Sequence, residues 1–158
     1  MLELAEPGLV DTVLSYCHYS LADSTLAPLL PDLTARGLGV ISASPLCMGL
    51  LTRRGPPEWH PAPAALRAAA AAASDAAAAA GADISELALR FAVREPRIAT
   101  TLVGMATPEQ VRANVATVVD ALAEGGGGSG GDAALAAALG ALAPVQGLSW
   151  SSGLPENN

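Results

Sequence analysis

Two short stretches of small and polar residues have the composition of ligand-binding loops. Residues 42–46 (SASPL) follow the apolar pair Val40 and Ile41, and residues 104–106 (GMA) follow the β-branched run IATTLV. Both leave backbone N–H groups open, and the second leads into a helix start at Thr107, where the helix dipole attracts anions. Because the carboxyl ends of parallel strands meet at one edge of a sheet, the two stretches predict a dinucleotide site, although polar strand ends also occur where nothing binds.

The other chemically active residue types are few. His18 lies between Tyr16 and Tyr19, which would suit acid–base catalysis, but a hydrogen-bonded histidine beside two half-buried tyrosines explains the same pattern. His60 follows Trp59, a pairing that favours loop packing over ligand binding. Neither histidine has another His, Cys or carboxylate at metal-ligand spacing, so no metal site is expected.

Composition excludes several classes of function. The chain has 158 residues and a net charge of −7, and all eight of its basic residues are arginines. The acidic balance argues against nucleic-acid binding and against adsorption to anionic membranes, and the absence of lysine excludes lysine-assisted catalysis within the chain. Cys17 and Cys47 lack disulfide-framework and metal spacing, so we expect buried thiols in a reducing, cytoplasmic compartment. Residues 64–80 are too rich in alanine to predict a membrane span.

Hydrophobic periodicity predicts strands alternating with helices. Strands are expected at residues 10–14, around Val40 and Ile41, and at residues 98–103. Helices are expected over a leucine stripe that starts at Leu26, over residues 64–80, after caps at Asp83 and Thr107, and over residues 132–143.

Local signals set the helix boundaries. Asp23 or Ser24 is expected to cap the first helix, and Pro31 to kink it unless a new segment begins there. Thr107 and Gln110 have the spacing of a capping box, with Pro108 as the first helical residue. The apolar face of that helix is predicted to consist of Val111, Val115, Val118 and Leu122.

This order of elements predicts an α/β fold with parallel strands joined by right-handed crossovers. About three strands cannot close an eight-stranded barrel, so two unpaired edges and exposed apolar surface are expected, through which the chain could self-associate. Residues 125–131 (GGGGSGG) predict a flexible insert between a first unit, residues 1–124, and a C-terminal helix and tail, residues 132–158. In the tail, the ring of Trp150 is expected to cover an apolar surface.

Five segments together resemble the aldo-keto reductase superfamily: LSYCHYSL, GLGVISASPLCMGLLT, GPPEWHPA, LVGMATPEQVRANV and PVQGLSWSSG. The resemblance covers nearly the whole chain outside the alanine-rich and glycine-rich stretches. It implies the C-terminal part of a (β/α)8 TIM barrel, which binds NAD or NADP across its C-terminal face. The third and fifth segments point to an NAD-dependent subgroup that oxidises a small sugar.

The resemblance also implies which residues contact the cofactor. These are Ser44, Leu46 and, more weakly, Met48 at the pyrophosphate; Gly104, Met105 and Ala106 near the adenosine ribose; Gln110 and Asn114 at the adenosine end; and Tyr16 in place of a glutamine that binds the nicotinamide carboxamide.

Three departures from the family pattern bear on activity. Ala43 stands where many members place an aromatic ring against the nicotinamide. Gln110 and Ala106 replace cationic residues that hold a 2′-phosphate, which favours NAD over NADP. The family's catalytic Asp, Tyr, Lys and His match no position in this sequence, so we expect a C-terminal portion of an enzyme that is inactive alone. The alternative is a non-catalytic half-barrel that associates with itself or with another chain.

Overall fold

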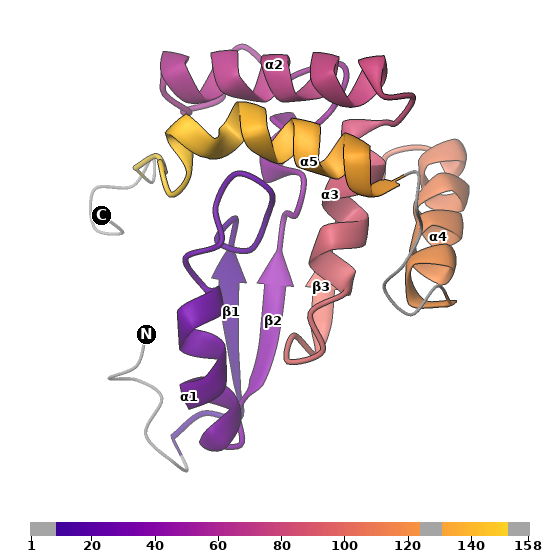
Figure 1. The fold of residues 1–158 in the computed structure, drawn as a ribbon. Helices are drawn as coiled ribbons and strands as arrows, with labels where there is room; N and C mark the ends of the chain where they lie inside the picture. The colour runs from indigo at the N-terminus through magenta and orange to yellow at the C-terminus, as the bar shows by residue number, and fades with distance from the viewer. Residues whose placement is uncertain (1–8, 124–130, 152–158) are drawn as a thin grey trace.

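A computed structural model describes residues 9–123 and 131–151 and contains one parallel sheet (Figure 1). Its strands are β1 (Thr12–Tyr16), β2 (Gly39–Ala43) and β3 (Thr100–Leu102), in the order β1-β2-β3. Both pairings are parallel, so all three carboxyl ends lie at the same edge of the sheet. The predicted α/β architecture with three parallel strands is confirmed.

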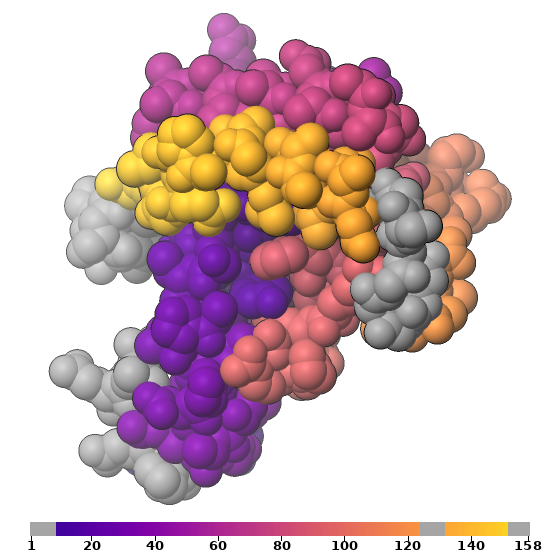
Figure 2. Space-filling view, in the orientation of Figure 1, coloured from indigo at the N-terminus to yellow at the C-terminus, as the bar shows by residue number. Residues whose placement is uncertain are grey.

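The described part of the chain contains five α-helices besides this sheet. They are α1 (Leu30–Ala35), α2 (Ala64–Ala79), α3 (Ile84–Val93), α4 (Pro108–Ala123) and α5 (Gly131–Leu142). Figure 1 shows α2 and α5 side by side beyond the carboxyl ends of the strands, and Figure 2 shows them as one continuous layer. Short 3-10 turns at Ala27–Leu29, Cys47–Gly49 and Ala143–Val145 complete the structure.

The larger core lies at the strand ends, between the loops and the α2–α5 layer. Helix α2 contributes Leu66 and a stripe of buried alanines at positions 70, 73 and 77, and α5 faces it with Ala134, Ala138 and Leu142. Alanine lets two helices approach closely and has the highest helix propensity. The alanine-rich composition therefore builds the cover over the strand ends.

A second core lies between α1 and the sheet. The buried leucines at positions 26, 30 and 33 pack there against Val40 of β2 and Ile98, which confirms the predicted leucine stripe. The ring of Tyr19 stacks on that of Phe91 with centroids 5.2 Å apart, linking this core to α3. The aliphatic burial fixes α1 on one face of the sheet.

The opposite face of the sheet is largely uncovered. Leu14 pairs in register with Ile41, and Tyr16 pairs with Ala43, so these side chains share one face. Leu14 is 52% exposed, and Leu102 on the same face is 47% exposed. Within the described residues, β1 and β3 each have one neighbouring strand, as the prediction of unpaired edges requires.

Strand boundaries differ from the prediction. Strand β1 begins at Thr12 and ends at Tyr16, two residues later than expected, and β3 is shorter than the predicted residues 98–103. Strand β2 continues through Ala43, so Ser42 lies within the strand and is completely buried. The prediction that Ser42 belongs to a phosphate-wrapping loop was wrong, because in-register pairing with Ser15 and Thr101 extends the strand past the apolar pair.

The first helix also begins later than predicted. Asp23 does not cap it; the Asp23 carboxylate instead accepts the backbone N–H of Thr25 at 2.8 Å in a local turn. A 3-10 turn follows, and α1 begins at Leu30 with Pro31 in its first turn, where proline is tolerated. The proline thus starts a new helical segment instead of kinking a longer helix.

The predicted apolar face of α4 is not its buried face. The buried residues are Thr117 and Ala121, whereas Val111, Val115 and Leu122 are exposed. Helix α4 packs against α3, and the small side chains allow that contact. The valine stripe turns away from it, so the periodicity was right and the direction of the face was wrong.

Two other helix predictions are confirmed. Asp83 caps α3, accepting the N–H of Ser85 at 2.7 Å. The predicted helix over residues 132–143 is α5, which begins at Gly131. Residues 1–8 and 124–130, where a helix end and most of the flexible insert were predicted, lie outside the described residues.

Candidate functional site

The loop after β2 has an unusual backbone. Ser44, Cys47 and Met48 have φ angles of +61°, +49° and +52°, a region that residues other than glycine seldom adopt. Each such residue costs on the order of 1–3 kcal/mol and persists only where its surroundings hold it. The loop is tied to β3 because the N–H of Ser44 donates to the carbonyl of Leu102 at 2.9 Å. Inside the loop, the N–H of Met48 donates to Oγ of Ser44 at 3.0 Å.

The loop after β3 is built from local signals. The N–H of Gln110 donates to Oγ1 of Thr107 at 3.3 Å, which confirms Thr107 as the cap of α4. Oε1 of Gln110 accepts the N–H of Ala106 at 2.7 Å, one residue before the position that a capping box would give. The Gln110 amide therefore closes the loop with its oxygen.

A cavity of about 580 Å³ lies between these two loops. Its lining comes from the loop after β2, the start of α3, the loop after β3 and α4: Leu46, Gly49, Thr52, Arg54, Gly55, Pro56, Pro57, Ser85, Gly104, Gln110 and Asn114. Four of these, Leu46, Gly104, Gln110 and Asn114, are residues that the sequence predicts as cofactor contacts. The fold thus brings together predicted residues that lie up to 68 positions apart in the chain.

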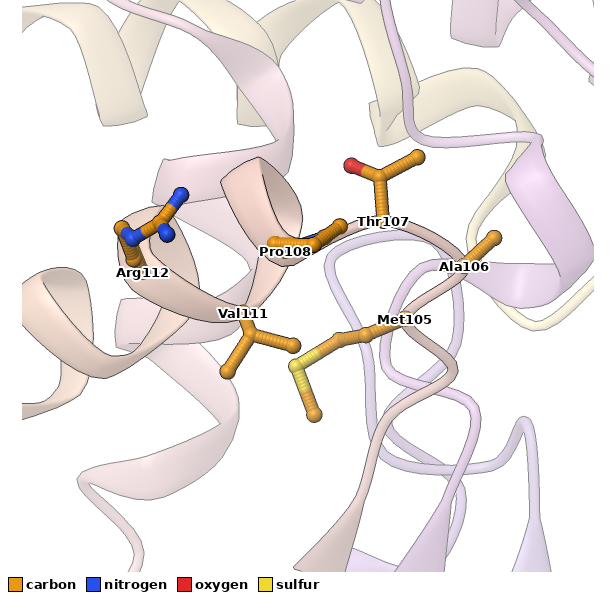
Figure 3. A pocket seen from close by; sticks show the side chains of 6 residues that line it. All are labelled: Met105, Ala106, Thr107, Pro108, Val111 and Arg112. Carbon is orange, nitrogen blue, oxygen red and sulfur yellow. The ribbon is translucent and has the colours of Figure 1, made fainter.

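Met105 and Ala106 lie on a different surface from Gly104. They line a shallow hollow of about 450 Å³ together with Thr107, Pro108, Val111 and Arg112. In Figure 3 the side chains of Met105 and Val111 approach each other, and that of Arg112 points away from them. The predicted ribose-side residues are therefore divided between two surfaces.

The remaining predicted contacts lie at the strand ends and line neither hollow. Tyr16 is the last residue of β1, about half exposed, and is paired in register with Ala43. Burial and the neighbouring Cys17 raise the pKa of Tyr16, against an opposing hydrogen-bond contribution from Ser44. Tyr16 and Ser44 therefore lie together, whereas Met48 belongs to the strained part of the loop.

His18 is the hydrogen-bonded histidine that the simpler interpretation expects. Its Nδ1 lies 2.9 Å from Oδ2 of Asp23, and Oγ1 of Thr25 donates to Oδ1 of the same carboxylate at 2.6 Å. Burial alone would raise the pKa of Asp23, but the hydrogen bonds from Thr25 and His18 outweigh it and lower the pKa. This cluster stabilises the turn that follows β1.

Both cysteines are buried thiols, as predicted. Sγ of Cys47 donates to Oγ of Ser20 at 3.2 Å, which connects the loop after β2 to the turn after β1. The hydrogen bond with Cys17, together with burial, raises the pKa of Cys47, so this side chain stays protonated.

Residues 9–123 and 131–151 contain no cluster of three or more His, Cys, Asp or Glu side chains that could hold a metal ion. No helix in the same residues has the length and apolar character needed to cross a membrane.

Sequence reasoning missed Arg54, the cationic side chain in the cavity lining. It lies in the proline-rich segment after β2, RRGPPEWHPAP, where no cofactor contact was predicted. The adjacent pair Arg53 and Arg54, in a chain with only eight cations, was the available signal. Only the fold shows which of the two faces the cavity.

The cavity lining combines one cationic side chain, two amide side chains and open backbone. Arg54 supplies a positive charge for phosphate, and Gln110 and Asn114 supply neutral hydrogen-bonding groups. No atom lies within 4 Å of the position where a Cβ would stand on Gly104, so this side of the cavity is open to a bulky ligand. Such a lining suits a ligand that carries both an anionic group and neutral hydrogen-bonding groups.

The profile of the Aldo/keto reductase family matches residues 2–124, and the chain belongs to that family. Among individual proteins, it is 45% identical over 157 residues to L-galactose dehydrogenase of Arabidopsis thaliana. That alignment covers 99% of this chain and 48% of the relative, so the chain spans about half the length of the protein it matches.

A solved structure supports the fold. The aldo-keto reductase AKR11C1 from Bacillus halodurans, in its holo form, matches with a TM-score of 0.56 and 24% identity, over 74% of this chain and 40% of that one. The three parallel strands and their helices therefore form part of a TIM barrel, as the resemblance implied.

Proposed function

We propose that this chain forms the phosphate and adenosine side of a nicotinamide dinucleotide site in an oxidoreductase. The observation that carries the proposal is the cavity between the loops after β2 and β3, where Arg54, Gln110 and Asn114 converge. Arg54 would pair with a phosphate, and the open backbone at Gly104 would admit the ribose. Ser44, Leu46 and Met48 would border the pyrophosphate, and Tyr16 would lie near the nicotinamide.

NAD is the favoured cofactor. Gln110 and Ala106 are neutral where a cation would hold a 2′-phosphate, and the Oε1 atom of Gln110 is already engaged by the Ala106 N–H. Arg54 is the cation in the cavity lining. If it pairs with the pyrophosphate, no second cation in that lining is left for the 2′-phosphate of NADP.

Isothermal titration of the chain with NAD⁺ and NADP⁺ tests this proposal. We expect NAD⁺ to bind more tightly, and Arg54→Ala to weaken its binding about tenfold, because a charge-assisted hydrogen bond is lost. Arg53→Ala is the matched control, since it removes the same charge one residue away, outside the cavity lining. Equal losses in both variants would point to nonspecific attraction and contradict the proposal.

The substrate we propose is L-galactose, after the relative's name, with hydride passing from C1 of the sugar to NAD⁺ and a proton released as L-galactono-1,4-lactone forms, a step of ascorbate biosynthesis. The chain contains no lysine, and no residue in it matches the family's catalytic tetrad. We therefore expect no turnover of L-galactose and NAD⁺ by this chain alone, measured as NADH absorbance. Turnover well above background would contradict this part of the proposal.

A second candidate is a half-barrel that associates with itself or another chain. The uncovered apolar side chains of the sheet and α4, such as Leu14, Leu102 and Leu122, favour it. Sedimentation velocity distinguishes the two candidates. A monomer that binds NAD⁺ supports the first alone, and a concentration-dependent dimer supports the second.

A further inference from the structure

The strained loop after β2 is held by a buried side chain from further along the chain. His60 is only 3% exposed, and it belongs to the GPPEWHPA segment. Its Nε2 lies 3.0 Å from the carbonyl oxygen of Cys47, one of the residues with positive φ. This contact therefore reaches the loop at one of its three left-handed residues other than glycine.

The protonation pattern of the His60 ring follows from its second contact. Nδ1 accepts the backbone N–H of Ala62 at 3.0 Å, so Nδ1 carries no hydrogen in this arrangement. Nε2 must then carry the hydrogen and donate it to the Cys47 carbonyl. Both ring nitrogens are committed, which fixes the ring between two backbone segments.

Other side chains hold His60 in place. Trp150 from the C-terminal tail meets the ring edge-on, with centroids 4.9 Å apart, whereas the exposed Trp59 ring lies farther away, at 6.4 Å. The Arg67 guanidinium, on α2, donates to the carbonyl of His60 and, at 3.1 Å, to that of Ala62. Helix α2 and the C-terminal tail therefore both hold the residue that donates to the Cys47 carbonyl.

We propose that His60 is a positioning residue for the dinucleotide site. It keeps Cys47 and Met48 in left-handed conformations, and so holds Ser44 and Leu46 where the pyrophosphate would bind. His60 does not line the cavity, so its effect on the ligand passes through the loop. The effect of His60 on NAD⁺ binding rests on the proposed function. Its effect on the backbone of the loop does not depend on any ligand.

The paired variants His60→Gln and His60→Asn test the proposal. A glutamine amide nitrogen lies near the place of Nε2 and can still donate to the Cys47 carbonyl, whereas asparagine reproduces only the Nδ1 side. We expect His60→Asn and His60→Ala to weaken NAD⁺ binding about tenfold and His60→Gln to stay within about twofold of the wild type. Equal affinities in the glutamine and asparagine variants would overturn the inference.

Two further measurements separate this inference from other effects. Leu33→Ala, in the core under α1, should lower stability while leaving NAD⁺ affinity unchanged, which excludes general destabilisation as the cause. Amide hydrogen exchange needs no ligand: Met48 and Leu50 should exchange faster in His60→Asn than in His60→Gln. If the wild type does not bind NAD⁺, the proposed function fails, and the exchange data still decide the role of His60. Unchanged exchange in both variants would overturn it.

Discussion

The two loops that border the cavity are held in opposite ways. The loop after β2 contains three left-handed residues other than glycine and is held by buried groups from distant segments, including His60 and Ser20. The loop after β3 is exposed and is closed by Gln110 and Thr107, both within six residues of it. The first loop depends on the whole fold, and the second depends on its own sequence. Changes in the larger core at the strand ends, to which Cys47 belongs, should therefore disturb the first loop and leave the second unchanged.

The largest expected effect comes from removing the tail's aromatic contact. Trp150→Ala should lower the free energy of unfolding by about 2 kcal/mol, because a partly buried ring against His60 and the larger core is lost. Trp59→Ala is the control: this ring is 72% exposed, and its loss should cost less than about 0.5 kcal/mol. Urea denaturation measures both. Amide exchange should rise in the loop after β2 only, and a rise in both loops would break the comparison.

A glycine in each loop gives a direct comparison of backbone strain. Gly49 has a φ of +91°, so Gly49→Ala should cost about 1–2 kcal/mol in the free energy of unfolding. Gly104 lies outside the left-handed region with open space around it, and Gly104→Ala should change that free energy by less than about 0.5 kcal/mol. Thermal unfolding of the two variants checks the difference. Equal costs would show that the loops are equally constrained.

Acid should loosen the loop after β2 first. Asp23 has a lowered pKa in the folded chain, so it contributes stability above the ordinary aspartate pKa and loses that contribution as the pH falls through the folded pKa. The Asp23 carbonyl accepts the N–H of Ser20, whose hydroxyl accepts the thiol of Cys47. Asp23→Asn should therefore reduce the acid-induced loss of stability, measured as the urea midpoint against pH.

The exposed Asp32 of α1 provides the control for this titration. Asp32→Asn removes the same negative charge from an exposed position outside the turn that holds Asp23. If the Asp32 variant reduces the acid sensitivity as much as the Asp23 variant does, net charge is responsible and the connection through Ser20 is wrong.

The smallest effect is expected at the loop after β3. Gln110→Ala removes one exposed hydrogen bond to the Ala106 N–H and should cost about 0.5 kcal/mol in the free energy of unfolding. Gln110→Glu keeps an oxygen acceptor near the helix N-terminus and should retain stability, but its charge should weaken NAD⁺ binding. Calorimetry of unfolding and of binding separates the two effects. A large loss of stability in the alanine variant would contradict local control of this loop.

Local rules explain what could be predicted. The cap at Thr107, the extent of α2 and the leucine stripe of the first helix depend on neighbours within one or two helical turns. The predicted contacts Leu46, Gly104, Gln110 and Asn114 converge because parallel strands end at one edge. Arg54 was missed, since no local pattern distinguishes it from Arg53.

Burial was harder to predict than periodicity. The valine stripe of α4 follows the expected spacing, but α4 contacts α3 through Thr117 and Ala121 instead. Ser42 is a small polar residue of the kind found in loops, but it lies buried in β2. The strand continues through it because it pairs with a strand on each side. In both places, which side chain is buried depends on neighbours that are remote in sequence.

The sequence by itself determined the order of strands and helices, the cap of α4 and the family of the chain, because each follows from short-range patterns of residue types. Only the tertiary structure decided that Cys47 and Met48 adopt left-handed conformations, that Arg54 faces the cavity, and which side of α4 is buried. The physical reason is the large sequence separation between the residues that make these contacts. His60 acts on Cys47 across 13 positions, and the Gln146 side chain holds the Leu21 carbonyl across 125, so these contacts exist only after the chain has folded.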